Sequence, residues 1–251
     1  MLKAPLLIEP DWPAPANVKA LQTTRLGGVS LGSFKSLNLG GHVADNELHV
    51  EQNRRRLAEH LPSLPLWLQQ VHGTAVVNEF QALNQPEADG AYTKEINQVC
   101  AVMTADCLPV LFCNESGTQV AAVHAGWRGL AAGILEKTLN TFDCKNEAIL
   151  VWLGPAIGPN AFEVGLPVYD AFCQGQAEAL DCFKKLKNEG GGGEDKWHAD
   201  LYSLARLRLK KAGIQQIYGG EECTFTNEAH FFSYRRDGET GRMATCIWLQ
   251  E

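Results

Sequence analysis

Short apolar runs without a polar face are the feature that most constrains how this chain folds. Residues 121–123 and 149–153 are apolar at every position. Strands of this kind are buried on both faces, so they need a covering layer on each side. Further apolar-rich runs, which are also expected to form strands, occupy residues 66–71, 99–103, 108–113, 120–124 and 243–249.

Helical patterns are interspersed with these strands. The apolar spacing predicts helices over residues 50–61, 130–142 and 200–212. Asp200 is suited to cap the start of the third helix, and Gly213 stands where a left-handed residue ends it. Because strands and helices do not alternate strictly, we expect an α/β (α+β) fold with mixed sheets and covering helices. A chain of 251 residues can bury a sizeable core, so we expect one domain over residues 1–251.

Bulk properties exclude several classes of protein. The formal net charge of −7 argues against a nucleic-acid or anionic-membrane surface, although a local basic pocket for a small anion remains compatible with it. No run approaches the roughly 18 apolar residues of a membrane span, and the N-terminal residues do not resemble a signal peptide. The eight cysteines are scattered, which favours reduced thiols in a cytoplasmic protein. The tetraglycine run 190–193 is expected to be a mobile surface loop.

Three apolar segments end in a side chain that can bind a metal, and these side chains are His72, Cys107 and His124. Catalytic groups gather at strand ends in open α/β sheets because the loops there can enclose a ligand. Two imidazoles and a thiolate suit a borderline-soft ion such as zinc, and copper suits them less well. Three protein ligands leave one position open, where bound water has a pKa of about 7.

Each of these residues also has a plain structural interpretation. A single histidine after a strand is more often a hydrogen-bonded structural residue, and a cysteine between apolar runs is usually a core residue. The three lie far apart along the chain, so no local ligand motif joins them. Asp106, next to Cys107, is suited either to orient a ligand or move a proton, or simply to cap a turn.

Glycine-rich segments supply possible anion-binding loops. Residues 126–129 lead into a predicted helix, where backbone N–H groups favour anions, and Arg128 adds a guanidinium suited to phosphate. Residues 24–30 and 36–42 are also glycine-rich with one polar residue each, and tight turns explain each of them better than ligand binding does. The loop 154–159 matches neither a Walker A nor a dinucleotide-binding motif.

Several of these segments together resemble the YfiH family, also called the multicopper polyphenol oxidase or laccase-domain family. It includes the bacterial peptidoglycan-editing factor PgeF and purine nucleoside phosphorylase of the YfiH type. The resemblance extends from about residue 23 to residue 248. The motifs that carry it lie at residues 38–40, 70–73, 104–109, 124–129, 154–159 and 231–237.

The resemblance implies a four-layer α/β/β/α fold and a zinc site on His72, Cys107 and His124. It also implies phosphorolysis of adenosine, inosine and S-methyl-5′-thioadenosine to a free base and ribose 1-phosphate, with an adenosine deaminase activity. The laccase name implies copper and phenol oxidation, but seven histidines are too few for a multicopper centre on this pattern. Asn160, where the family commonly has cysteine, and the tetraglycine run depart from the family pattern.

We expect Cys107, His124, His72 and Asp106 to form the catalytic group. In deamination, zinc-activated water would attack C6 of adenosine while Asp106 or Glu163 moves protons, as in zinc deaminases of other folds.

In phosphorolysis, an arginine would hold phosphate, and Asn38 would form a hydrogen bond with ribose or base. The arginine candidates are Arg25, Arg128 and Arg235. The expected partners are therefore purine nucleosides and phosphate, with no nucleic acid and no membrane.

Two other functions compete with this one. The first is a cysteine amidohydrolase with Cys107 as nucleophile and His124 or His72 as base, which would remove a wrong amino acid from a peptidoglycan precursor. The second is a zinc-binding protein without catalytic activity. Metal removal, alkylation of Cys107 and product analysis with adenosine and phosphate distinguish the three.

Overall fold

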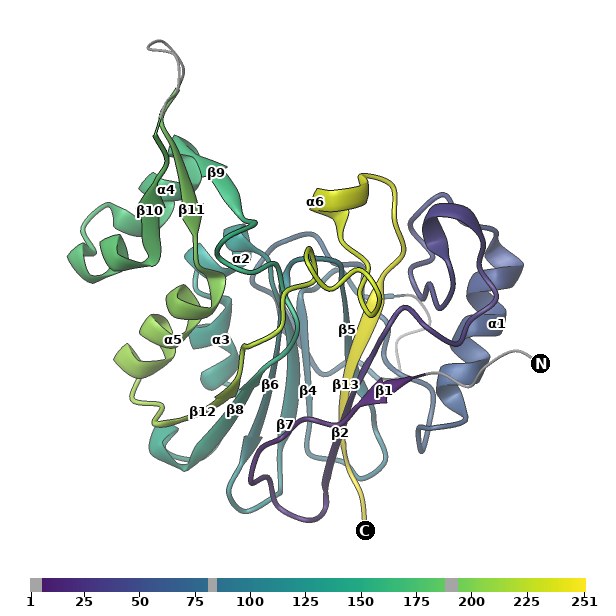
Figure 1. Cartoon of the computed structure of the whole chain (residues 1–251). Helices are drawn as coiled ribbons and strands as arrows, with labels where there is room; N and C mark the ends of the chain where they lie inside the picture. Colours follow the sequence, from purple (N-terminus) through teal and green to yellow (C-terminus); the bar gives the residue numbers. More distant parts are fainter. Residues whose placement is uncertain (1–5, 81–84, 188–193) are drawn as a thin grey trace.

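The computed structural model describes residues 6–80, 85–187 and 194–251. The tetraglycine run 190–193 lies outside these residues, so the prediction of a mobile loop there stays a prediction. A six-stranded mixed sheet forms the centre of the molecule (Figure 1). Its strands, in spatial order, are β12 (Gln216–Gly219), β8 (Ile149–Leu153), β6 (Leu108–Asn114), β7 (Val120–Ala125), β4 (Gly90–Thr93) and β3 (Val76–Val77).

A second, fully antiparallel sheet packs face to face against the first. Its strands, in spatial order, are β1 (Leu7–Ile8), β2 (Val18–Thr23), β13 (Met243–Leu249) and β5 (Cys100–Thr104). A small third sheet lies at the edge of the molecule and consists of β10 (Phe183–Lys185), β11 (Lys196–Ala199) and β9 (Glu163–Gly165).

The pleat of β6 shows why the core has separate layers. Leu108, Val110 and Phe112 belong to one apolar cluster, whereas Leu111 and Cys113 belong to another. Successive strand side chains point to opposite faces, so β6 contributes to the core on both sides of its sheet. The first cluster packs against helices, and the second fills the space between the two sheets.

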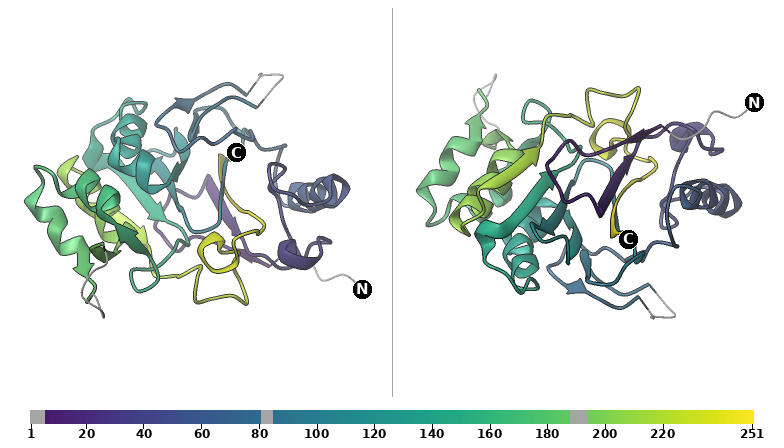
Figure 2. Two further views of the ribbon diagram at one scale, coloured as in Figure 1. Left: turned by 90° about the horizontal axis from the view of Figure 1, so that it is seen from above. Right: turned by 90° about the horizontal axis from the view of Figure 1, so that it is seen from below.

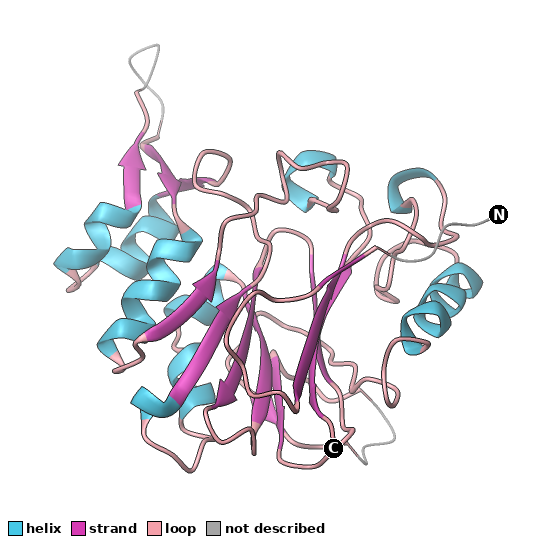
Figure 3. Ribbon diagram, turned by 60° about the horizontal axis from the view of Figure 1, so that its bottom comes forward, coloured by secondary structure: helices cyan, strands magenta, loops and turns pink. Residues whose placement is uncertain are grey.

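Helices cover the two outer faces. The outer face of the six-stranded sheet carries α2 (Trp127–Ala131), α3 (Ile134–Leu139), α4 (Leu166–Cys173) and α5 (Leu201–Lys211). Helix α1 (Glu47–Ala58) places Leu57 against the outer face of the four-stranded sheet. Seen from above, α1 and the other helices lie on opposite sides of the strands (Figure 2), and Figure 3 shows the strands between helices on both sides. The α/β class and the α/β/β/α layering are confirmed.

The structure contains most of the strands predicted from the sequence, together with several that were not predicted. Strands at 99–103, 108–113, 120–124, 149–153 and 243–249 are present within one or two residues of their expected bounds. Asp200 caps α5 by accepting from the N–H of Ser203, and Gly213 has a φ of 92° just after the helix. The short or polar strands β1 to β4 and β9 to β12 have no clear apolar pattern, and the sequence did not indicate them.

Two predicted elements are wrong. The helix expected over residues 130–142 begins earlier, in α2, and is interrupted because Gly133 adopts a φ of 95°, which an α-helix does not contain. Residues 66–71 form no strand and make only isolated bridges at Leu66 and Gln69. The N–H of Val71 is bound by the side chain of Asp89 instead of a neighbouring strand.

A four-residue helix, α6 (Tyr234–Asp237), lies above the ends of the two sheets (Figure 1). Its position places Tyr234 and Arg235 beside the cavity described below. Within the described residues, none of the helices combines the length and the apolar character needed to cross a bilayer.

Asn53 of α1 is fully buried and fastens the segment 29–38 to the helix. Its side chain accepts from the N–H of Val29 and donates to Ser30 Oγ and to the carbonyls of Ser36 and Asn38. We expect Asn53→Ala to lower the free energy of unfolding by about 2–4 kcal/mol, because it leaves buried partners without hydrogen bonds. Denaturant unfolding measures this.

The neighbouring Gln52 is exposed, and Gln52→Ala serves as the matched control with an expected change below about 0.5 kcal/mol. Equal stability of the two variants would contradict the role assigned to Asn53.

Candidate metal centre

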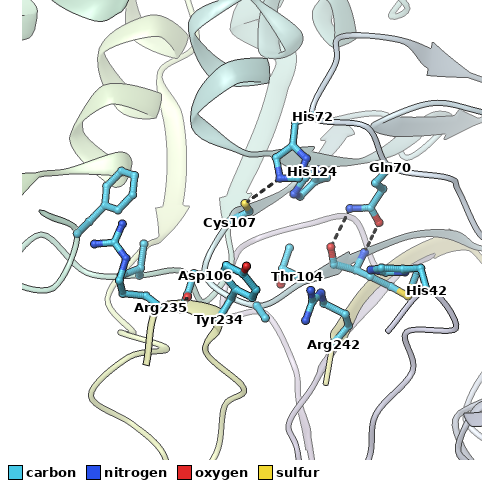
Figure 4. Close-up of a pocket in the computed structure, with 14 residues that line it drawn as sticks. His42, Gln70, His72, Thr104, Asp106, Cys107, His124, Tyr234, Arg235 and Arg242 are labelled. Atoms are coloured by element: carbon cyan, nitrogen blue, oxygen red, sulfur yellow. Dashed lines mark hydrogen bonds between the residues drawn. The ribbon is translucent and has the colours of Figure 1, made fainter. Parts of the chain in front are cut away.

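His72, Cys107 and His124 meet at one point, although they are far apart along the chain. One donor atom from each lies within 4.8 Å of the other two. Cys107 Sγ is 3.7 Å from His72 Nε2, and the two imidazole rings pack edge to face with centroids 4.8 Å apart. Figure 4 shows the three side chains pointing toward one another. Among the described residues, this is the one group of three or more such donors that converges.

The backbone turns sharply at two of these positions. His72 has a φ of 60°, and Asp106, immediately before Cys107, has a φ of 93°. Both values lie in the left-handed region, which non-glycine residues adopt rarely and in which Asn, Asp and His are over-represented. His124 is held differently, because it lies within the central strand β7 and opposite Pro109 of β6. Two strained turns and one rigid strand therefore bring the three side chains together.

Gly126 provides the room that this cluster needs. A Cβ atom at this position would lie 2.7 Å from His72 Cδ2 and 3.3 Å from Cys107 Sγ. The first distance is shorter than a normal contact, so any other residue would displace the imidazole. The glycine that follows His124 by two residues thus has a steric role at the site.

The donor set fits a tetrahedral metal ion. Around zinc, nitrogen and sulfur ligands lie about 3.3–3.6 Å apart, given bond lengths of about 2.0–2.3 Å. The pair Cys107 and His72 already has a similar separation. Three protein donors beside an open cavity correspond to a site that retains one position for solvent or substrate.

Asp89 organises the cluster, and the sequence analysis did not identify it. Its carboxylate accepts a hydrogen bond of 2.7 Å from His124 Nδ1. It also accepts from three consecutive backbone N–H groups, those of Val71 (3.2 Å), His72 (2.9 Å) and Gly73 (2.6 Å). Burial opposes ionisation of Asp89, but these hydrogen bonds, that from His124 first, hold its pKa below the usual range. One carboxylate therefore positions both histidines.

The electrostatics favour a thiolate at Cys107. Removal from water opposes ionisation, but His124 and then His72 outweigh it through charge and hydrogen bonding, so the pKa of Cys107 falls to about 6. Burial likewise disfavours the charged form of His124, yet Cys107 and Asp89 raise its pKa to about 9. The protein without metal thus favours a thiolate–imidazolium pair at neutral pH, and thiolate is the form that binds metal.

The cluster forms part of the wall of a cavity of about 500 Å³, within the range of small-molecule sites. Figure 4 shows Arg235 at one end of this cavity, here called the aromatic end because the guanidinium lies over the ring of Phe162. Arg242, His42 and Gln70 lie at the other, here called the basic end. Besides the three donors, the lining residues are His42, Gln70, Met103, Thr104, Ala105, Asp106, Ile157, Phe162, Tyr234, Arg235 and Arg242.

Asp106 lines the cavity, but its carboxylate is already engaged. Oδ1 accepts from Thr224 Oγ1 at 2.6 Å, and Oδ2 accepts from Ser233 Oγ at 3.0 Å and from the N–H of Arg235 at 2.6 Å. These bonds tie the C-terminal segment to the start of β6. Glu163, the other expected proton carrier, pairs with Lys196 at 2.6 Å and does not line the cavity.

Of the three arginines expected to hold phosphate, the structure brings one to the cavity. Arg235 lines it, whereas Arg25 lies over the ring of Phe232, and Arg128 is exposed and lies over Trp127. An arginine that the sequence analysis missed, Arg242, lines the cavity instead. It stands just before β13 without any motif that distinguishes it.

Asn38 is fully buried and does not line the cavity. Its side chain donates to Asp45 Oδ2 at 2.9 Å and accepts from the N–H groups of Gly40 and Arg242 at 2.9 Å each. The expected contact with ribose or base is thus replaced by bonds that join two loops. His42, in the same glycine-rich segment, reaches the cavity and was not anticipated.

Comparisons with known proteins identify the family of this chain. Residues 19–250 match the family model described as multi-copper polyphenol oxidoreductase laccase. The chain belongs to this family. The YfiH-type laccase-domain resemblance seen in the sequence is thereby confirmed.

Similar proteins of this family carry another name. A protein of Shigella flexneri named purine nucleoside phosphorylase YfiH is 55% identical over 97% of this chain and 98% of that protein. An Escherichia coli (strain K12) protein of the same name is 54% identical over the same shares of the two chains.

Solved structures of family members have the same fold. A crystal structure of a Neisseria meningitidis protein superposes with a TM-score of 0.91 at 52% identity and covers 99% of this chain and 100% of that one. The structure of YlmD from Geobacillus stearothermophilus gives 0.79 at 37% identity, over 95% and 94% of the two chains.

Asp89→Asn tests how the histidines are positioned. The asparagine amide is uncharged and has only one acceptor oxygen, so it cannot replace the hydrogen bonds that the carboxylate accepts from His124 and from the backbone. We therefore expect the affinity for zinc to fall about 10–100-fold. Competition with a chromophoric chelator measures it. Asp143→Asn, at an exposed carboxylate that pairs with Lys94, is the control and should leave the affinity unchanged. Unchanged zinc affinity in Asp89→Asn would contradict the assigned role.

Alkylation of metal-free protein tests the electrostatics. A lowered thiol pKa means that the thiolate forms as pH rises through about 6 and persists above it. We expect the iodoacetamide rate at Cys107, followed by peptide mass spectrometry, to reach half its plateau near pH 6. Cys144, whose pKa is raised mainly by burial, should react only in alkaline solution. A midpoint for Cys107 above pH 8 would refute the ion pair.

Proposed function

We propose that this chain is a zinc-dependent purine nucleoside enzyme. It would convert adenosine, inosine and S-methyl-5′-thioadenosine with phosphate to free base and ribose 1-phosphate, and it would also deaminate adenosine. The observation that carries the proposal is the convergence of His72, Cys107 and His124 on the wall of a cavity of about 500 Å³. The names of relatives that match almost the whole chain support the phosphorolysis.

The aromatic end of the cavity suits a purine. Phe162 and Arg235 lie together there, and Ile157 also lines the cavity. The ring of Tyr234 lies nearer the middle, with the guanidinium carbon of Arg242 5.9 Å from its centroid. Aromatic rings and a guanidinium plane stack on flat heterocycles. Arg235 itself lies over Phe162, with its guanidinium carbon 5.5 Å from the ring centroid. This end therefore offers flat surfaces to a base.

Phosphorolysis requires two bonds to change. A phosphate oxygen forms a bond to C1′ of the ribose while the bond from C1′ to the purine nitrogen breaks. The electron pair of that bond stays on the purine, which takes up the proton of hydrogen phosphate. The protein must then hold phosphate and nucleoside in line and favour the charge of the departing base.

The donor set favours zinc over copper. Two histidines and a cysteine with an open position match catalytic zinc sites. A zinc ion there would polarise an oxygen atom and lower the pKa of bound water to about 7. A multicopper centre needs further histidine clusters, and the described residues contain no second group of converging donors. The donor set thus supports a site for one zinc ion more strongly than a multicopper centre that would oxidise phenols.

Deamination replaces the amino group at C6 with an oxygen from water and releases ammonia. Asp106 lines the cavity and remains the candidate carrier of a proton, whereas Glu163 lies outside it. We further propose small-molecule partners only, with neither nucleic acid nor membrane. The eight free cysteines support a cytoplasmic location.

One observation favours a cysteine amidohydrolase as the second candidate. Cys107, His124 and Asp89 form a chain of nucleophile, base and orienting carboxylate, since Asp89 binds His124 Nδ1 at 2.7 Å. This is the order of groups found in cysteine hydrolases. The same three residues therefore suit either a metal or an acyl-transfer reaction, here the removal of a wrong amino acid from a peptidoglycan precursor.

Metal content and product analysis distinguish the two functions. We expect purified protein to contain about one zinc per chain by elemental analysis and to release base and ribose 1-phosphate from inosine and phosphate by chromatography. Chelation and Cys107→Ala should each lower the rate more than 100-fold, and added zinc should restore only the chelated enzyme. Cys223→Ala, at a thiol outside the cluster, is the control.

Activity that survives complete zinc removal but ends on alkylation of Cys107 would favour the amidohydrolase. Zinc-loaded protein that releases no base would overturn the proposed phosphorolysis.

A further inference from the structure

The basic end of the cavity contains a polar group without a partner. Thr104, at the end of β5, is 2% exposed and lines the cavity, and its hydroxyl has no hydrogen-bond partner among the described residues. An unsatisfied buried hydroxyl costs about 1–3 kcal/mol. Such groups are rare unless a ligand or water completes them.

Arg242 immediately precedes the strand that pairs with β5, and it lines the same cavity as Thr104. Thr104 pairs with Met243 in the sheet, and Arg242 is the residue before Met243. The Nη1 atom of Arg242 donates to the carbonyls of Thr240 and Gly241. Its Nε and Nη2 atoms make no hydrogen bond within the described parts of the chain, and Figure 4 shows the guanidinium directed toward the cavity. One side of the guanidinium is thus anchored, and the other is available.

His42 lies at the same end of the cavity as Arg242 (Figure 4). It lines the cavity, and burial, followed by the charges of Arg242, Arg54 and His124, lowers the pKa of its imidazole. Arg54 is held nearby by the carbonyl of Leu39. The lowered pKa favours the neutral imidazole, which can donate one hydrogen bond, so the positive charge at this end comes from Arg242.

We propose that Thr104, Arg242 and His42 form the phosphate subsite of this cavity, with the purine at the opposite end beside Phe162. This inference rests on the proposed phosphorolysis and specifies where its second substrate binds. A guanidinium edge, a hydroxyl and an imidazole supply the donors that phosphate oxygens require. In Figure 4 the three zinc-type donors lie between Arg235 at one end and Arg242 at the other, so both substrates would meet beside them.

Arg235 is the alternative phosphate ligand, and its contacts favour a different role. Its Nη1 atom donates to the carbonyl of Glu163 at 2.8 Å, and its guanidinium lies over Phe162. It stands at the aromatic end, away from the orphan hydroxyl. Arg235 is therefore placed to contact the base rather than the phosphate.

Three variants test the subsite with steady-state kinetics. Arg242→Gln should raise KM for phosphate roughly tenfold or more, because it removes a charge-assisted contact. Thr104→Val should raise it several-fold, and Thr104→Ser should restore it. KM for inosine should change less than about twofold in all three. Because the Thr104 hydroxyl has no protein partner, Thr104→Val should retain the thermal stability of the parent.

Arg128→Gln is the matched control, since Arg128 is exposed and lies outside the cavity. Calorimetric titration of each zinc-loaded protein with inorganic phosphate alone gives an independent measurement. Weaker phosphate binding in Arg242→Gln and Thr104→Val, but not in Arg128→Gln, supports the subsite even if no phosphorolysis occurs.

Phosphorolysis with an unchanged KM for phosphate in both cavity variants overturns the subsite and leaves the proposed function standing. Parent protein that neither binds phosphate nor releases base overturns both.

Discussion

The carboxylate of Asp89 is the interaction on which the rest of the site depends. It accepts the Nδ1 proton of His124 and the N–H groups of the turn that carries His72. The turn has a left-handed residue and no strand partner, so without these bonds its backbone donors would be unsatisfied. A single buried anion thus fixes the orientation of one imidazole and the backbone of the other.

The layers make this arrangement rigid. Strands β6 and β7 are buried on both faces by helices and by the second sheet. Cys107 leads into one of these strands, and His124 lies in the other. Dense packing on both sides prevents the strands from shifting, so the cysteine and histidine keep their separation.

The cavity joins three kinds of chemistry. Its aromatic end offers flat surfaces, its basic end offers charge and an unpaired hydroxyl, and the cysteine and histidines form the wall between them. This sequence of environments suits a substrate with a base, a sugar and an attacking anion.

By itself, the sequence determined the fold class, the central strands and the identity of His72, Cys107 and His124, because apolar runs and the residues that end them are local patterns. The resemblance to the family supplied the four layers. Only the tertiary structure showed that Asp89 binds His124 and that Arg242 lines the cavity. It also showed that Asn38, Arg25 and Arg128 lie outside the cavity. Those roles depend on which distant groups a side chain meets. Local spacing carries no information about such contacts, since an aspartate or arginine has the same pattern whether it faces a cavity or solvent.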